Sequence, residues 1–135
     1  MQLSDFREDE IKQRQGTPIY IGSATFYVRR WGTPEAIDKR KELMHALFGP
    51  LHKRTEMDDA ELLAHWLADY GVVGWEGVKD ENGELVEYSQ DTARSVFLDE
   101  GMYLSLNEHL FIEASKFENY LFDQAVESAE EIKKH

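Results

Sequence analysis

Residues 61–88 read ELLAHWLADYGVVGWEGVKDENGELVEY, and the change from helix to strand in this stretch decides the fold. Apolar residues at helical spacing precede Gly71, and two β-branched valines follow it. Trp75 then lies between Gly74 and Gly77, where the absence of side chains lets the backbone pack close to its large ring. The pattern predicts a buried, structural tryptophan in a tight connection.

The residues on either side of this tryptophan predict a helix before it and leave two alternatives after it. Asp58 or Asp59 is expected to cap a helix over residues 60–70, which ends at a glycine. After the tryptophan, residues 72–78 either pair with residues 85–88 across an Asn-Gly turn or stay unpaired.

The N-terminal part of the chain predicts a hairpin followed by a helix. β-forming residues fill most of the segment 18–31, and a Gly-Ser turn at 22–23 divides it. Thr33 is a good helix cap, and the proline after it suits the first turn. We therefore expect a helix over residues 34–48, which a Gly-Pro pair ends.

Three charged segments of the N-terminal part carry weaker signals. Residues 1–16 form either a short helix that begins at Ser4 or a mobile arm. Arg29 and Arg30 are either solvated or part of an anion-facing patch. The basic triplet at 39–41 is interpreted as a solvated helix face.

The C-terminal part predicts two more helices. Ser89 is expected to cap a helix over residues 90–100. Ser105 or Asn107 then opens the last and longest helix, whose apolar residues recur every three or four positions as far as Ile132. This stripe is wider than one core face needs, so we expect a helix that is buried by its own core and also by a partner.

These patterns together predict a single domain over residues 1–135. Its expected class is α+β, mainly α with a small β component, with an N-terminal β-hairpin packed on about four helices. A chain of 135 residues suits one domain and buries enough surface to fold without a disulfide or a metal.

Composition excludes several classes of function. The net charge is −12, which excludes nucleic acid as a partner, because phosphate contacts need a basic face. The absence of Cys excludes disulfides and thiolate metal sites. No apolar run approaches the ~20 residues that cross a bilayer, and the N-terminus has no apolar signal core. We therefore expect a cytoplasmic protein with no membrane partner.

Charge is distributed unevenly along the chain. Residues 1–58 carry ten Lys or Arg and nine Asp or Glu, whereas residues 59–135 carry five and eighteen. Such a difference either simply keeps the surface soluble or lets a neutral front meet an acidic back on a neighbouring copy. The second interpretation predicts head-to-tail self-association into a ring or spiral.

The sequence contains no motif of a known catalytic or metal site. Its five histidines form no HExxH pair, and the acidic turn at 80–83 lacks the glycine that an EF-hand needs at its sixth position. GxSxG, P-loop and GxGxxG motifs are also missing. We therefore expect no catalytic residue, no cofactor and no metal, in a protein that is not an enzyme.

The motifs around the tryptophan follow a specific order. An apolar helix runs into a Gly-Trp-x-Gly-Val step, then an acidic glycine turn, then a Tyr-Ser that opens the next helix. The residues at these positions are Gly74, Trp75, Gly77, Val78, Gly83, Tyr88 and Ser89. With the strand-like segment 24–30 and the step at 113–119, this order resembles the tail assembly chaperones of long-tailed, siphovirus-type bacteriophages.

The resemblance implies a non-enzymatic assembly function. Proteins of that family bind the long, helical tape measure protein, keep it soluble and help the tail tube protein polymerise around it. They self-associate, act in the host cytoplasm and are absent from the mature virion. In many such phages a frameshifted, longer product recruits the tail tube protein.

The wide apolar stripe of the last helix supplies the candidate partner site. Phe111, Phe117, Leu121 and Phe122 exceed what one core face needs, so we expect them to contact the tape measure protein. The alternative function is an acidic regulator that mimics nucleic acid and blocks a DNA-binding protein. Regular rows of carboxylates on one face would distinguish that alternative.

Overall fold

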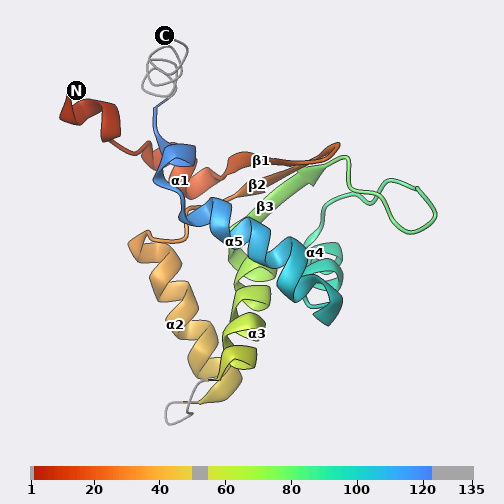
Figure 1. The fold of residues 1–135 in the computed structure, drawn as a ribbon. Helices are drawn as coiled ribbons and strands as arrows, with labels where there is room; N and C mark the ends of the chain where they lie inside the picture. Colours follow the sequence, from red (N-terminus) through yellow and green to blue (C-terminus); the bar gives the residue numbers. More distant parts are fainter. Residues whose placement is uncertain (1, 50–54, 123–135) are drawn as a thin grey trace.

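The computed structural model of the protein describes residues 2–49 and 55–122 (Figure 1). Within these residues it contains five α-helices and a three-stranded antiparallel sheet, so the predicted class, mainly α with a small β component, is confirmed. The strands are β1 (Thr17–Ile21), β2 (Ala24–Val28) and β3 (Val72–Glu76), and the helices are α1 (Glu10–Gln15), α2 (Pro34–Phe48), α3 (Glu56–Trp66), α4 (Gln90–Phe97) and α5 (Glu108–Ser115).

The sheet consists of the predicted hairpin and one further strand. β1 pairs antiparallel with β2, and β3 pairs antiparallel with the other edge of β2. The alternative in which 72–78 pairs with 85–88 is wrong for β3 itself. Of the predicted pairing, the structure contains one hydrogen bond after the end of β3, from Val86 N to Val78 O at 2.8 Å, beside an isolated bridge between Lys79 and Leu85.

An aromatic pair explains why β3 joins β2. Trp75 lies opposite Phe26, and the two rings meet edge to face with centroids 6.0 Å apart on the buried face of the sheet. The acidic turn offers β3 no apolar contact of this kind. Trp75 is 7% exposed, as predicted, and its Nε1 donates to Val86 O at 2.7 Å.

The end of β3 needs a glycine. Gly77 has a φ of 73°, and a Cβ at this position would lie 2.6 Å from the carbonyl oxygen of Ser23. The chain therefore leaves the sheet directly beside the β1–β2 turn.

Side-chain caps set the start of three helices. Thr33 and Ser89 accept from the third residue of α2 and α4, as predicted, and α2 ends at Gly49. The prediction for α3 is wrong, because Thr55 rather than an aspartate is its cap. Thr55 and Asp58 form a reciprocal capping box, so the aspartate serves inside the first turn. α4 ends at Phe97, earlier than predicted, and a 3₁₀ turn follows it.

α3 continues into one π-helical turn, Leu67–Gly71, before β3 begins. Trp66 is fully buried beside this turn, and its Nε1 donates to Ala36 O of α2 at 3.3 Å. A Cβ on Gly71 would lie only 2.2 Å from the Trp66 ring. The turn is therefore built around the tryptophan.

The predicted long final helix is wrong within the described residues, because α5 ends at Ser115. The carbonyl of Ala114 accepts from Trp31 N at 3.0 Å and from Arg30 Nη1 at 3.2 Å. Asn119 Nδ2 donates to Glu113 O at 2.9 Å and satisfies a second carbonyl of the last turn. The predicted continuation over 123–132 lies outside the described residues.

The start of the final helix also differs from the prediction. Asn107 does not cap it but is fully buried, and its Nδ2 donates to Phe97 O at 2.8 Å. The helical path begins at Asp99, whose side chain accepts from Gly101 N, and it passes through the π-helical turn η4 (Tyr103–Asn107) into α5.

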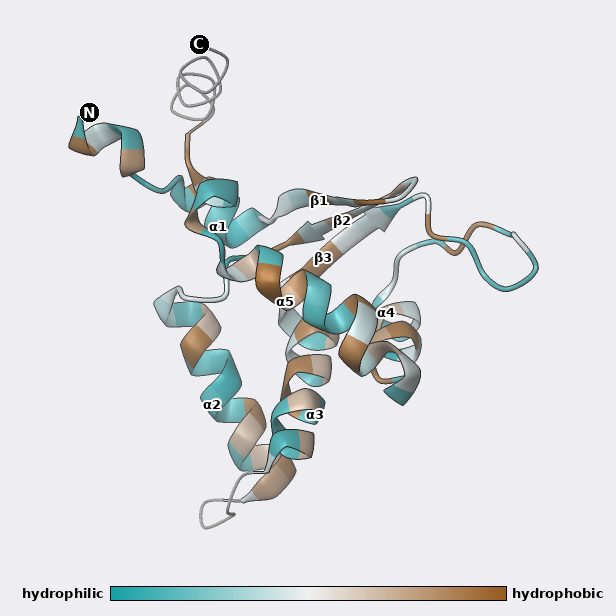
Figure 2. Ribbon diagram, viewed as in Figure 1, coloured by the Kyte–Doolittle hydropathy of each residue, from teal (hydrophilic) through white to brown (hydrophobic). Residues whose placement is uncertain are grey.

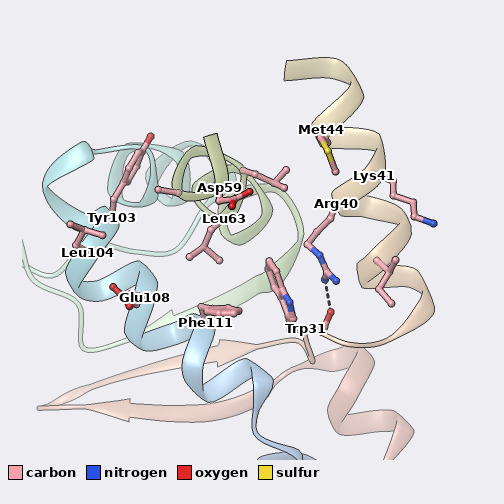
Figure 3. A pocket seen from close by; sticks show the side chains of 13 residues that line it. Trp31, Arg40, Lys41, Met44, Asp59, Leu63, Tyr103, Leu104, Glu108 and Phe111 are labelled. Carbon is pink, nitrogen blue, oxygen red and sulfur yellow. Dashed lines mark hydrogen bonds between the residues drawn. The ribbon is translucent and has the colours of Figure 1, made fainter. Parts of the chain in front are cut away.

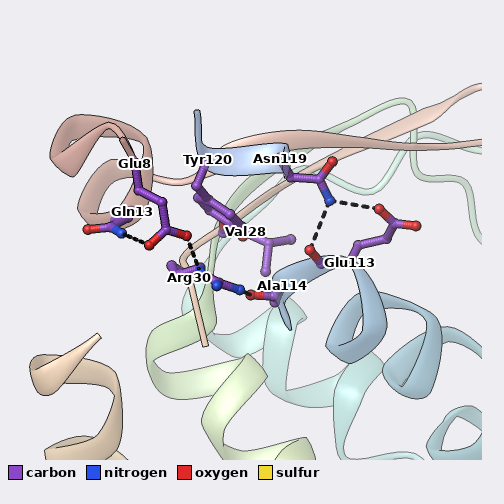
Figure 4. Close-up of polar contacts among 8 residues, drawn as sticks. All are labelled: Glu8, Gln13, Val28, Arg30, Glu113, Ala114, Asn119 and Tyr120. Carbon is purple, nitrogen blue, oxygen red and sulfur yellow. Dashed lines mark hydrogen bonds and ion pairs between the residues drawn. The ribbon is translucent and has the colours of Figure 1, made fainter. Parts of the chain in front are cut away.

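Arg30 joins both ends of the described chain to the sheet, so the solvated alternative is wrong for this residue and it faces a carboxylate instead. Its Nε lies 2.9 Å from Glu8 Oε1, and its guanidinium lies over the ring of Tyr120 (Figure 4). Tyr120 is fully buried and donates from its hydroxyl to Val28 O at 2.9 Å. Burial raises the pKa of Tyr120 well above its usual value, so the hydroxyl remains a donor.

The segment before the sheet is neither one helix nor a free arm. A 3₁₀ turn, Leu3–Phe6, precedes α1, which Asp9 caps. Between them Glu8 forms a bridge with Leu121. Residues from Glu8 onward are therefore attached to the body of the fold.

Helices α2 to α5 lie on one side of the sheet, and the core forms between them (Figure 1). Figure 2 shows hydrophobic and hydrophilic residues alternating along α2, α3 and α5, as amphipathic helices require. In the described ranges, no helix has the length and apolarity that crossing a membrane demands.

We predict that Tyr120→Phe lowers the free energy of unfolding by about 1–3 kcal/mol, because it leaves the buried carbonyl of Val28 without its donor. Urea denaturation followed by circular dichroism measures this change. Tyr20→Phe is the control, since Tyr20 is exposed and its replacement should have little effect. Equal stability of Tyr120→Phe and wild type would contradict the anchoring role.

We also predict that Gly71→Ala destabilises the protein by about 1–3 kcal/mol or more, because the added methyl group forces the Trp66 ring out of its place. Thermal unfolding is the measurement. Gly32→Ala is the matched control, since no atom lies within 4 Å of the methyl group it would add. A Gly71→Ala protein that melts like the control would show that this packing is not a constraint.

Candidate functional site

An open groove lies between α2, α3 and the helical path from η4 into α5 (Figure 3). Its volume is about 560 Å³, which is within the usual range for binding pockets. We refer to it as the three-helix groove. Its lining consists of Trp31, Ile37, Arg40, Lys41, Met44, Asp59, Ala60, Leu62, Leu63, Tyr103, Leu104, Glu108 and Phe111.

The lining follows helical spacing on each side. α2 contributes Ile37, Arg40 and Met44, and the opposite wall contributes Leu104, Glu108 and Phe111. These residues recur every three or four positions, so each wall is one continuous face of a helix. α3 supplies the floor between the two walls.

An aromatic cluster closes one end of the groove. The Trp31 ring meets Trp66 at 4.7 Å and Phe111 at 4.9 Å between centroids, both edge to face. The Arg40 guanidinium lies 3.8 Å from the centroid of the Trp31 ring and donates to the Trp31 carbonyl. These contacts hold the end of the groove in one arrangement.

Arg40 corrects the interpretation of residues 39–41 as a solvated face. Burial lowers the pKa of its guanidinium, which nevertheless stays charged at neutral pH. Lys39 turns away to a neighbour on the same helix, where its Nζ lies 3.6 Å from Glu42 Oε1. Arg40 therefore places a positive charge inside the groove.

The open end of the groove has an apolar rim. Leu104 is 83% exposed at the start of one wall. Leu63 and Phe111 lie deeper and are half-buried. Exposed apolar side chains beside a concave apolar surface are typical of a site that binds another protein.

The predicted partner residues do not form one surface. Phe111 lines the groove, but Phe117 lies beyond the end of α5, where it is 39% exposed with its ring 6.3 Å from that of Phe6. Phe122 is exposed after the last 3₁₀ turn. The prediction for Leu121 is wrong, because it is 6% exposed and belongs to the buried interior. The break at Ser115 separates these residues.

The residues around Trp75 support the fold and do not line this groove. Tyr88 donates from its hydroxyl to Val72 O at 3.0 Å, and Ser89 caps α4. Gly83 has a φ of 77° in the acidic turn. In the parts of the chain that the structure describes, no cluster of three or more His, Cys, Asp or Glu side chains is arranged to hold a metal ion.

Sequence reasoning missed most of the groove. Trp31 follows the hairpin directly, and only its position before the Thr33 cap connects it with α2. Leu104 carries a usable signal, since it is a large apolar residue outside the predicted helices. Its exposure depends on the position of η4, which the sequence pattern does not predict.

One comparison with known proteins identifies a family. The YdaY prophage protein family matches residues 34–134, which include every helix from α2 to α5 and all of the groove except Trp31. No curated protein and no solved structure matches the chain. Because the family match covers well over half of the sequence, the chain belongs to the YdaY prophage protein family.

Proposed function

We propose that this prophage protein is a non-enzymatic tail assembly chaperone that holds an amphipathic helix of the tape measure protein in the three-helix groove. The observation that carries the proposal is the groove itself, with helical faces on both walls and an exposed apolar rim. The order of motifs from Gly74 to Ser89 and the prophage family support a role in phage assembly.

A helix is the partner that the shape of the groove favours. Each wall presents side chains at intervals of three or four residues, and these make the ridges into which another helix packs. A bound helix would place apolar residues from one face between α2 and α5, above Leu63 and against the aromatic end at Trp31. It would complete a small bundle of helices.

The charge of the chain supports a chaperone rather than a permanent scaffold. A net charge of −12 keeps a complex soluble while the groove covers an apolar stripe of the partner. The mainly apolar lining of the groove favours this function over mimicry of nucleic acid, for which rows of carboxylates would be needed.

The proposal extends to the other expected partners. The tail tube protein would be recruited through a longer, frameshifted product, and copies of the chain would associate in the host cytoplasm before the virion is complete. The uneven charge of residues 1–58 and 59–135 supports head-to-tail association.

We predict that Leu104→Asp weakens binding of the tape measure protein roughly tenfold or more, because the bound helix would have to bury an unpaired carboxylate. Leu104 is 83% exposed, so the change should leave the fold intact. Leu85→Asp is the control, since Leu85 is 69% exposed in the acidic turn away from the groove. The measurement is the soluble fraction of the tape measure protein from the same prophage during co-expression.

Two negative results of this experiment would contradict different parts of the proposal. If Leu104→Asp keeps the tape measure protein as soluble as wild type does, the groove is not the site. If wild type gives no gain over the tape measure protein expressed alone, the chaperone function is contradicted.

We further predict reversible self-association that weakens with salt, because the complementary charges of successive copies are screened. Light scattering over a concentration series, at low and at high salt, measures the average mass. A protein that stays monomeric at every concentration in low salt would contradict the head-to-tail arrangement.

A further inference from the structure

The two walls of the three-helix groove carry opposite charges. Arg40 lies on the α2 wall with its guanidinium over the Trp31 ring, whereas Glu108 lies on the α5 wall (Figure 3). Lys41 also lines the α2 wall, but its amine points away from the groove. Between the walls the lining is apolar. A partner in the groove therefore has a positive surface along one flank and a negative surface along the other.

Other residues strengthen the negative field of the α5 side. Burial raises the pKa of Tyr103, and the nearby carboxylates of Glu61, Glu100 and Asp99 raise it further. On α2, the carboxylate of Glu42 is paired with Lys39, and that of Glu35 with Arg14 on α1. Neither carboxylate lines the groove, to which α2 presents the guanidinium of Arg40.

The two ends of the groove also differ. Trp31 and Phe111 form the closed, aromatic end, and Met44 and Leu104 lie toward the open end. Ile37 also lines the groove, one turn before Arg40 on α2 and so next to the closed end. A helix that is reversed in the groove keeps its apolar stripe against the floor but exchanges its two flanks. Since the walls are opposite in charge, the two directions are not equivalent for a helix whose flanks differ in charge.

We propose that the three-helix groove is directional. It binds an amphipathic helix that has carboxylates along the flank facing α2 and Lys or Arg along the flank facing α5, and it holds this helix in one direction. The inference rests on the proposed function, because it specifies the helical partner that the groove accepts. Direction matters for a chaperone of a long helical chain, since successive copies would then bind that chain in the same sense.

The test uses two synthetic amphipathic helices of about 15 residues, long enough to be helical in water when built from good helix formers. Both have the same apolar stripe and the same composition. One has Glu on one flank and Lys on the other, and the second has these flanks exchanged. Each carries a nitroxide spin label at its N-terminus, and NMR of the full chain records which amide signals the label broadens.

We expect each peptide to prefer one direction by about fivefold or more, from a few exposed ion pairs acting together. The label of one peptide should broaden signals of Ile37 and Phe111 at the closed end. The label of the exchanged peptide should instead broaden signals of Met44 and Leu104. High salt should reduce both preferences toward equal populations.

A variant with like charges on both walls provides the control. Glu108→Lys makes the α5 wall positive while Arg40 keeps the α2 wall positive, so both peptides should lose their preference for one direction. Glu108 is exposed, and circular dichroism checks that the variant is folded.

The outcomes separate this inference from the proposed function. If both peptides bind and each label broadens both ends equally, the groove is not directional, although it still binds helices. If Glu108→Lys leaves the directional preferences unchanged, the wall charges do not set them. If neither peptide shifts any signal of the groove, helix binding itself is contradicted.

Discussion

Trp66 packs where α2, α3 and the start of β3 meet. Its ring is fully buried, and its Nε1 hydrogen bond to Ala36 O holds α2 beside α3. The ring leaves no space for a side chain at Gly71, so the chain turns there from helix into β3. Trp31 packs against the same ring. One side chain therefore connects the helix pair, the sheet and the closed end of the groove.

The end of α5 determines whether a groove exists. Arg30 and Trp31 both donate hydrogen bonds to the carbonyl of Ala114. The buried Tyr120 donates to the carbonyl of Val28, which holds the chain after α5 at the end of β2. α5 therefore stops while the face that runs from Leu104 in η4 to Phe111 in α5 lies opposite α2. Trp31, in the linker after β2, thus has two roles. Its backbone N–H binds the last turn of α5, and its indole ring closes the groove.

The predictions that succeeded from sequence depend on local chemistry, and those that failed depend on contacts distant in the chain. The Thr33 and Ser89 caps and the burial of Trp75 follow from neighbouring residues. The pairing of β3 with β2 joins segments about fifty residues apart, and Arg30 reaches α5 across more than eighty. For the same reason, sequence periodicity put Phe111, which lines the groove, and Leu121, which is buried, on the same face.

Hydrogen exchange tests the central claim, binding of a tape measure helix in the three-helix groove, most directly. The measurement compares the chain alone with the chain saturated by a helical segment of the tape measure protein from the same prophage. We predict slower exchange in α2, in the first turns of α3 and from η4 into α5, with no change in β1 or in the acidic turn at 80–83. Protection confined to the sheet or to that turn, with the groove helices unchanged, would contradict it.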